Sequence, residues 1–421
     1  MFQSFIAASI FCVVASAFAE TVVAQGSTVM PEHSLDFTCQ HEIFHTISTE
    51  VDSMFMYGRW LQRNNLLARD GLVNREVERF YRIAAEHGHS KASINLQNGV
   101  FRGEFSAQPG DSLRLSERLI EAEVASGYYF VGEMLSSGAG GLDQDSEMAL
   151  KYFRKAADLG SADAQFYLGR LLSPKFAEPA VAEQMYKCSA QQGHGKAGLA
   201  LGVRFKNQKK YDEALEAFQL AIAAGDESAA SFMAKGFSGV EKSNQLHYLG
   251  QEHDSERSER YKRISKILAG WSYANPKVPE INEIVPLPPS ALPAWEGNLK
   301  WVDERKANLP PIEPDEELIK RMAGEKNLDP MTGKPMPGSP AFSNANFPVR
   351  ICWTGTACPT SGYWKVIWPI SGQLARPDVI QYFEEGAIFP TQVIRMYHPR
   401  YWPMKDKWIS KVSGVEWGLM G

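Results

Sequence analysis

The chain has 421 residues and a formal net charge of −5, with 44% hydrophobic and 22% charged residues. This length allows two or three domains, and the negative balance argues against a general nucleic-acid binder, which usually has a basic face. After residue 19, no stretch reaches the roughly 18 apolar residues that a membrane span needs. We therefore expect no transmembrane segment in the mature chain.

The N-terminus has the pattern of a secretory signal peptide. An apolar run extends from Phe5 to Val14, and residues 17–19 (AFA) form a small-x-small cleavage site before Glu20. The positively charged start that is typical of such signals is missing. The pattern predicts a signal peptide over residues 1–19 and an exported mature protein.

The phrase CQHEIFH contains the H-E-x-x-H pattern of zinc proteases, formed by His41, Glu42 and His45. In that pattern two histidines one helical turn apart hold zinc, and the glutamate acts as general base. The extended form of the motif is absent, because Ser48 stands at its glycine position, and no strand pattern surrounds the segment. A zinc hydrolase is therefore the remote alternative. The favoured interpretation is an N-terminal segment that docks on the first hairpin through Cys39 and His41.

Residues 20–74 are predicted to form N-terminal cap helices. Apolar side chains in residues 50–66 recur at helical spacing, at positions 51, 54, 55, 57, 60 and 61. Such a stripe predicts a helix that buries one face against the next element.

One phrase recurs between residues 75 and 240. It reads AAEHGHSKA, AADLGSADA, SAQQGHGKA and AIAAGDESA, with a shorter version EVASGYYFVG. The central glycines are spaced 39, 33, 33 and 32 residues apart, a period typical of helical solenoids. These glycines are Gly88, Gly127, Gly160, Gly193 and Gly225.

The letters of the phrase indicate helical hairpins. Gly160 is placed to take the left-handed conformation that ends the first helix of a hairpin. Small residues near it let two helices approach closely, while Tyr152 and Phe153 supply the bulk between adjacent hairpins. The small residues assigned to this packing are Ala156, Ala157, Ala164, Gly169 and Gly202.

The unit from residues 128 to 172 resembles the SEL-one-like repeat (SLR), a relative of the tetratricopeptide repeat. The resemblance covers residues 75–240 and is weaker at its ends, where Gln97 replaces the glycine of the second helix. It implies a mainly α fold, an α-solenoid of SLR/TPR-like hairpins that binds proteins on its concave face. It implies a protein partner rather than a reaction.

Two different segments follow the repeats. Residues 241–275 contain the charged run EHDSERSERYKR and are predicted as a closing helix with one solvated face. Residues 276–348 hold 14 of the 24 prolines and predict an extended strap, because proline fits neither a helix interior nor a central strand. Apolar residues within the strap indicate that it lies on the solenoid. A short helix is predicted at 315–326, where acidic residues follow Pro314.

Residues 349–421 predict a small β-rich domain. SGYWKVIW alternates as a strand does, and the last 75 residues hold six of the ten tryptophans, which we expect mainly in the core. The cysteines after the signal peptide are Cys39, Cys188, Cys352 and Cys358. We predict a Cys352–Cys358 disulfide, with two reduced thiols as the alternative. A Cys39–Cys188 pair would follow only because these two cysteines are left over.

The phrases FTCQHE, VPLPPSALPAWEG, NLDPMTGKP and CPTSGYW together resemble a group of enterobacterial repeat proteins that we identify with periplasmic immunity proteins of type VI secretion. The resemblance implies a periplasmic protein that neutralises a secreted antibacterial effector, such as a lipase or phospholipase, by direct occlusion. The C-terminal domain would then close over the bound effector. An envelope assembly adaptor is the alternative. We expect no catalytic residue, no metal ligand and no cofactor.

Overall fold

The computed structural model describes residues 36–106, 110–175, 179–336, 339, 341, 351–359, 362–367, 374–375, 380–398, 407–413 and 415–419. The predicted signal peptide, residues 1–19, lies outside the described residues. None of the described helices is both long enough and apolar enough to cross a membrane.

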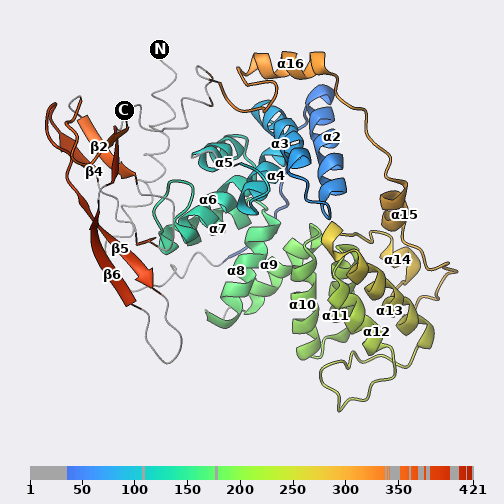
Figure 1. The fold of residues 1–421 in the computed structure, drawn as a ribbon. Coiled ribbons are helices and arrows are strands. Elements are labelled where there is room, and N and C mark those ends of the chain that lie inside the picture. Colours follow the sequence, from blue (N-terminus) through green and yellow to red (C-terminus); the bar gives the residue numbers. More distant parts are fainter. Residues whose placement is uncertain are drawn as a thin grey trace. The chain divides into compact units, whose positions relative to one another are not determined.

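The region of the repeats is an array of α-helices in which each helix packs against its neighbours in sequence (Figure 1). The predicted helix at 50–66 is α2, and five hairpins follow it: α3–α4, α5–α6, α7–α8, α9–α10 and α11–α12. The helices of the array are α2 (Thr49–Asn65), α3 (Gly71–Glu86), α4 (Ser90–Phe101), α5 (Asp111–Glu121), α6 (Ala125–Ser137), α7 (Ser146–Asp158), α8 (Ala162–Lys175), α9 (Pro179–Gln191), α10 (Gly195–Asn207), α11 (Tyr211–Ala223), α12 (Glu227–Gly236) and α13 (Ser255–Gly270). This arrangement confirms the predicted α-solenoid of helical hairpins.

The turns of the hairpins lie where the phrase places them, with one correction. Gly88, Gly160, Gly193 and Gly225 have φ angles of 86°, 106°, 86° and 91°, the left-handed conformation that ends a helix. In the second hairpin Glu123 takes this conformation, with φ of 55°.

Gly127 was therefore aligned wrongly, because it lies inside α6, four residues after the turn. A Cβ at Gly127 would lie 2.7 Å from the Ser116 carbonyl oxygen, so glycine is needed there for close helix contact. Fully buried alanines occupy the same position in the other hairpins: Ala92, Ala164, Ala197 and Ala229. The repeat is therefore more regular in space than the glycine spacing indicated.

Small residues on second helices accept large side chains from the next hairpin. On three second helices this position is a glycine, and a Cβ added there would lie 2.8, 2.9 or 2.5 Å from an aromatic ring on the first helix of the next hairpin. The pairs are Gly132 with Phe153, Gly169 with Tyr186, and Gly202 with Phe218. Ala156 and Ala157 are fully buried at the end of α7, as predicted. The joints of hairpin 2 with 3, of 3 with 4 and of 4 with 5 are therefore apolar. Each depends on a glycine that leaves room for an aromatic ring.

Replacing Gly202 by alanine is expected to lower the free energy of unfolding by about 1–2 kcal/mol. The added methyl overpacks the Phe218 contact, and this cost exceeds the helix-propensity gain of roughly 1 kcal/mol. Gly324→Ala is the matched control, because no other segment of the described chain comes within 4 Å of a Cβ placed at Gly324 in α16 (Glu316–Glu325). Urea unfolding of both variants measures the difference. Equal stability of the two variants would contradict this account of the joint.

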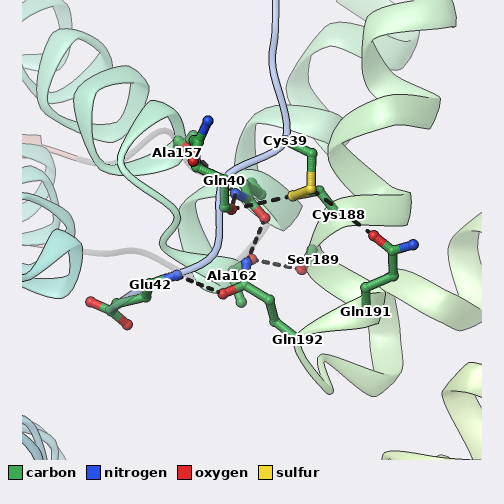
Figure 2. Close-up of a disulfide and its surroundings, with 10 residues drawn as sticks. Cys39, Gln40, Glu42, Ala157, Ala162, Cys188, Ser189, Gln191 and Gln192 are labelled. Atoms are coloured by element: carbon green, nitrogen blue, oxygen red, sulfur yellow. Dashed lines mark hydrogen bonds between the residues drawn. A yellow bond between two sulfur atoms is a disulfide. The ribbon is translucent and has the colours of Figure 1, made fainter. Parts of the chain in front are cut away.

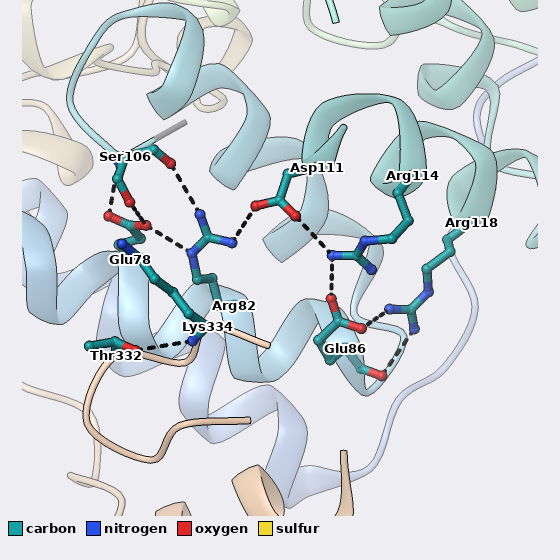
Figure 3. Close-up of polar contacts among 9 residues, drawn as sticks. All are labelled: Glu78, Arg82, Glu86, Ser106, Asp111, Arg114, Arg118, Thr332 and Lys334. Carbon is teal, nitrogen blue, oxygen red and sulfur yellow. Dashed lines mark hydrogen bonds and ion pairs between the residues drawn. The ribbon is translucent and has the colours of Figure 1, made fainter. Parts of the chain in front are cut away.

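The joint between hairpins 1 and 2 is polar instead. Gln97 takes the position of the missing glycine, and its Oε1 accepts a hydrogen bond of 2.9 Å from Ser116 Oγ. Beside it, a row of alternating charges joins α3 to α5 (Figure 3). The successive ion pairs are Glu78–Arg82 (2.8 Å), Arg82–Asp111 (2.7 Å), Asp111–Arg114 (3.4 Å), Arg114–Glu86 (2.7 Å) and Glu86–Arg118 (2.5 Å).

The first half of the proline-rich strap packs on the last hairpins. It contains α14 (Ile281–Ile284) and α15 (Lys300–Ala307), which the proline content did not predict. Val278 N donates to Ala223 O at 2.9 Å, and Gln219 Nε2 donates to Val285 O at 2.7 Å. The apolar strap residues that pack on the core of α11–α13 are Ile281, Ile284, Val285, Leu287, Leu292, Trp295, Leu299, Trp301 and Val302.

The second half of the strap reaches the first helices of the array. Arg305 Nη2 donates to Arg63 O at 2.7 Å, and Trp60 Nε1 donates to Asn308 O at 3.4 Å. The predicted helix at 315–326 is α16, which begins after Asp315, whose side chain caps Leu318 N at 2.7 Å. The apolar face of α16 packs in the core formed by α2, α3 and α4. The strap therefore contacts both the last and the first helices.

The C-terminal part is β-rich, as predicted. Strands β1 (Ile351–Trp353), β7 (Glu416–Leu419), β2 (Gly362–Ile367) and β4 (Ile380–Phe383) form one sheet in that order. Strands β3 (Leu374–Ala375), β5 (Gln392–His398) and β6 (Lys407–Ser413) form a second sheet. Every pairing between the described strands is antiparallel. Trp364, Trp417 and Phe389 are fully buried and pack together, which confirms a core role for these aromatic residues.

Candidate partner-binding site

The segment with the H-E-x-x-H pattern is not helical and lies across the turns of the middle hairpins. Gln40 O accepts from Gln165 Nε2 of α8 at 2.9 Å, and His45 Nε2 donates to Ala122 O before α6 at 2.9 Å. The segment therefore docks as the favoured interpretation held, but mainly on hairpins 2 to 4. It reaches the first hairpin through Phe44, whose ring centroid lies 5.2 Å from Lys91 Nζ of α4.

Glu42 caps helix α6. The residue before α6 is Val124, whose side chain makes no capping bond. Ser126 N and Oγ donate to the two carboxylate oxygens of Glu42 at 2.5 and 3.0 Å. A carboxylate at a helix N-terminus is favoured by the unpaired N–H groups and by the helix dipole. Burial raises the pKa of Glu42, although the hydrogen bonds from Ser126 oppose this rise.

A disulfide between Cys39 and Cys188 fixes this segment to α9 (Figure 2). Nearby, a Cβ at Gly160 would lie 2.4 Å from the carbonyl carbon of His41, so only glycine lets the segment cross this turn. Gly225 has a comparable role, because a Cβ there would lie 1.9 Å from Pro276 O of the strap. Among the described residues, no other segment comes within 4 Å of a Cβ placed at Gly88 or Gly193.

This geometry does not assemble the zinc site that the motif describes. The segment is not helical, so His41 and His45 are not held one helical turn apart on a helix face, and His45 is not part of the donor cluster around His41. The donor atoms of Cys39, His41 and Cys188 lie within 4.8 Å of one another. The two sulfurs are bonded to each other, however, and zinc binds cysteine as a thiolate.

The predicted Cys352–Cys358 disulfide is wrong in the structure, since the two residues are not joined. Backbone pairing holds them on different segments. Cys352 lies opposite Trp417 of β7, whereas Cys358 N donates to Ala387 O and Cys358 O accepts from Gly386 N, both at 2.7 Å. Both cysteines contribute to the small aromatic core as apolar fillers.

A patch of tyrosines and carboxylates lies on α6 and α8, next to the docked segment. We call it the tyrosine–carboxylate surface, formed by Tyr129, Glu133, Asp163 and Tyr167. Both tyrosines are half-buried and pack on the same buried ring, Phe153, with centroid distances of 5.6 and 4.3 Å. The shared ring fixes the two tyrosines beside each other while leaving part of each exposed.

The charged groups of this surface are carboxylates, so its charge is negative. Burial raises the pKa of Glu133, and the Asp163 charge adds to this rise while a hydrogen bond with Tyr129 opposes it. Burial and the same two carboxylates raise the pKa of Tyr129. Within the described residues, neither carboxylate forms an ion pair with a lysine or arginine, and the only cation-capable partner is His194, 3.5 Å from Asp163. The surface therefore presents partly desolvated negative charge between aromatic rings.

None of these four residues was predicted from the sequence. The sequence does contain a pattern that marks the two tyrosines. Counted from the left-handed turn residues Glu123 and Gly160, aromatic residues stand at positions six and seven in both hairpins: Tyr129-Phe130 and Phe166-Tyr167. In the alignment through Gly127 the two pairs fall out of register.

The comparisons with known proteins matched one family and several structures. A family model described as "Domain of unknown function (DUF6396)" matches residues 229–336, from within α12 into the strap. The comparison with curated proteins gave no significant match.

Among solved structures, the chain is similar to "immunity protein PA5088 from Pseudomonas aeruginosa", with 22% identity and a TM-score of 0.47, over 60% of this chain and 94% of that one. It is also similar to "Pseudomonas aeruginosa 5086 (PA5086)", with 24% identity and a TM-score of 0.45, over 60% and 95% of the two chains. A Sel1 repeat protein from Oxalobacter formigenes shows 18% identity and a TM-score of 0.38, over 52% and 87%.

Proposed function

We propose that this chain is a protein-binding repeat protein that neutralises a secreted antibacterial effector by covering it. The tyrosine–carboxylate surface is the observation that carries this proposal. Binding hot spots are enriched in tyrosine, and they lie in well-packed positions surrounded by contacts that exclude water. Tyr129 and Tyr167 meet this description, because Phe153 holds both rings in place before any partner arrives.

The charge of the surface indicates the chemistry of the partner segment. Glu133 and Asp163 have no lysine or arginine ion-pair partner within the described chain, so a basic side chain of the partner would gain a charge-assisted hydrogen bond. An arginine would in addition stack on the adjacent tyrosine rings. We therefore propose that the effector presents an arginine or lysine to this surface.

We further propose that the encounter takes place in the periplasm. The apolar run and the AFA site at residues 17–19 are typical of exported proteins. The Cys39–Cys188 disulfide supports the same location, since disulfides persist mainly in oxidising compartments.

The test begins with a pull-down of the tagged mature protein from the periplasm of its host, with partners identified by mass spectrometry. We expect one stoichiometric partner that is toxic when expressed alone and harmless when co-expressed with this chain. Against that purified partner, Tyr129→Ala and Glu133→Gln are each expected to weaken binding by about 30-fold or more, the size of a hot-spot effect. Tyr273→Ala is the matched control, because Tyr273 is exposed on a different segment.

Other results would redirect the proposal. Several envelope proteins captured in small amounts would favour an assembly adaptor. No capture from a strain shown to produce the effector would contradict neutralisation by occlusion. Tight, protective binding that Tyr129→Ala leaves unchanged would retain the function and reject this surface as the contact.

A further inference from the structure

A basic groove runs along the seam between α12 and α13, on helices that the proposed function does not use. It has a volume of about 450 Å³. Its lining consists of three lysines (Lys235, Lys262 and Lys266), one glutamate (Glu259) and six serines or alanines. Small side chains and lysines thus account for nine of the ten lining residues.

The small residues form the floor and hold the helices together. Ser258 Oγ of α13 donates to Ala234 O of α12 at 2.7 Å, and Ser265 Oγ donates to Glu227 O at 3.1 Å. These hydroxyl protons are therefore already engaged. The remaining donors of the lining are mainly the ammonium groups of the three exposed lysines.

In α13 the arginines contact the strap and the lysines line the groove. Its arginines face the strap: Arg260 Nη1 donates to Ile284 O at 2.8 Å and Nη2 to Pro293 O at 2.7 Å. Arg257 donates to the carbonyls of Pro286 and Ser290, and Arg263 lies 5.7 Å from the Trp295 ring centroid. Arginine suits such fixed, multi-donor contacts, whereas lysine is a mobile point charge. The lysines are thus not needed to hold the strap.

The lysines of the groove are weakly engaged. Lys262 pairs with Glu259 at 3.1 Å, but both side chains are exposed, and such pairs contribute little. Lys235 Nζ donates to His247 Nε2 at 3.3 Å. Lys266 has no ion pair or hydrogen bond with another described residue. With one carboxylate against three ammonium groups, the groove carries a net charge of +2.

We infer that this groove binds a phosphate-bearing ligand. A phosphate ester carries one or two negative charges on several acceptor oxygens, so it can receive hydrogen bonds from three ammonium groups at once. A carboxylate ligand would offer only two acceptor oxygens and one negative charge, so it fits three ammonium groups less well than a phosphate does. The groove is open to solvent, with all three lysines exposed, and its volume of about 450 Å³ has room for such a group. The phosphate can belong to a small soluble ester or to a lipid head group.

Calorimetric titration of the full mature protein with sn-glycerol 3-phosphate and with inorganic phosphate tests the inference. We expect a dissociation constant of about 1 mM or below for the ester, weakened about tenfold or more in K235A/K262A/K266A. K151A/K155A/K187A is the matched control, because it removes three exposed lysines elsewhere and should leave binding unchanged. Ser231→Phe fills the groove without removing charge and should weaken binding to a similar extent.

A flotation assay distinguishes the two sources of phosphate. Binding to phosphatidylglycerol vesicles but not to phosphatidylcholine vesicles, lost in the triple variant, assigns a lipid head group. Binding of glycerol 3-phosphate without vesicle binding assigns a soluble ester. Two results would overturn the inference: no binding of either probe below about 10 mM, or binding of hexaglutamate in preference to glycerol 3-phosphate, which would identify an acidic peptide instead. None of these outcomes depends on the effector.

Discussion

Arg82→Met is expected to lower the free energy of unfolding by about 3–5 kcal/mol, the cost of leaving a buried charge without its partner. The Arg82 side chain is 3% exposed and lies between Glu78 and Asp111, which are 6% and 8% exposed. Arg82 Nη2 also donates to Ser106 O at 3.1 Å. The variant therefore loses two ion pairs and a backbone contact, and it leaves two buried carboxylates without this cation.

The pH dependence of this loss has a definite sign. Burial alone would raise the pKa of Glu78, but Arg82 and the hydrogen bonds from Ser106 lower it below its usual value. A lowered pKa in the folded protein gives stability that is present at neutral pH and lost in acid. Without Arg82, burial is no longer opposed by the cation, and protonating the carboxylate relieves the cost. The stability gap between wild type and variant should therefore narrow from pH 7 towards pH 4.

Arg321→Met provides the matched control for the number of ion pairs. Arg321 also contacts two carboxylates, Glu50 at 2.7 Å and Glu325 at 2.9 Å, but its side chain is 47% exposed. Exposed pairs of this kind contribute about 0–1 kcal/mol. Urea unfolding of both variants at pH 7 and pH 4 decides the matter. If Arg82→Met costs no more than Arg321→Met, the buried network does not stabilise the joint between hairpins 1 and 2.

Cys39→Ser is expected to cost about 2–5 kcal/mol of stability, because the disulfide constrains a long loop in the unfolded chain. The two cysteines are 149 residues apart in sequence. Thermal unfolding with and without a dithiol reductant measures the effect: reductant should lower the midpoint of the wild type and leave that of Cys39→Ser unchanged. Cys352→Ser is the control, since Cys352 is not in a disulfide.

The structural consequence of losing this disulfide should be local as well as global. The docked segment supplies the Glu42 carboxylate that caps α6 through Ser126. Release of the segment should therefore expose its backbone near His41 to limited proteolysis and weaken the protection of α6 amides from hydrogen exchange. A wild-type midpoint that does not respond to reductant would show that the noncovalent contacts hold the segment without the disulfide.

The sequence by itself determined the helical hairpins, because the features that specify them are local. A helix ends where a left-handed residue such as Gly160 is tolerated, and small residues recur one helical turn beyond it. The same local reasoning placed α2 and the acidic first turn of α16. It failed at Gly127, because Glu123 adopts the left-handed conformation without the glycine that usually marks it.

Only the tertiary structure decided which distant residues meet. The disulfide joins Cys39 to Cys188, which are far apart in sequence, whereas Cys352 and Cys358, six positions apart, are not joined. Closeness in sequence does not fix the backbone geometry that a disulfide needs. Gly160 and Gly193 look alike in sequence, yet only the turn of Gly160 is crossed by another segment. Glu42 caps a helix for the same reason: its partner, Ser126, lies 84 residues away and is brought near only by the stacking of hairpins.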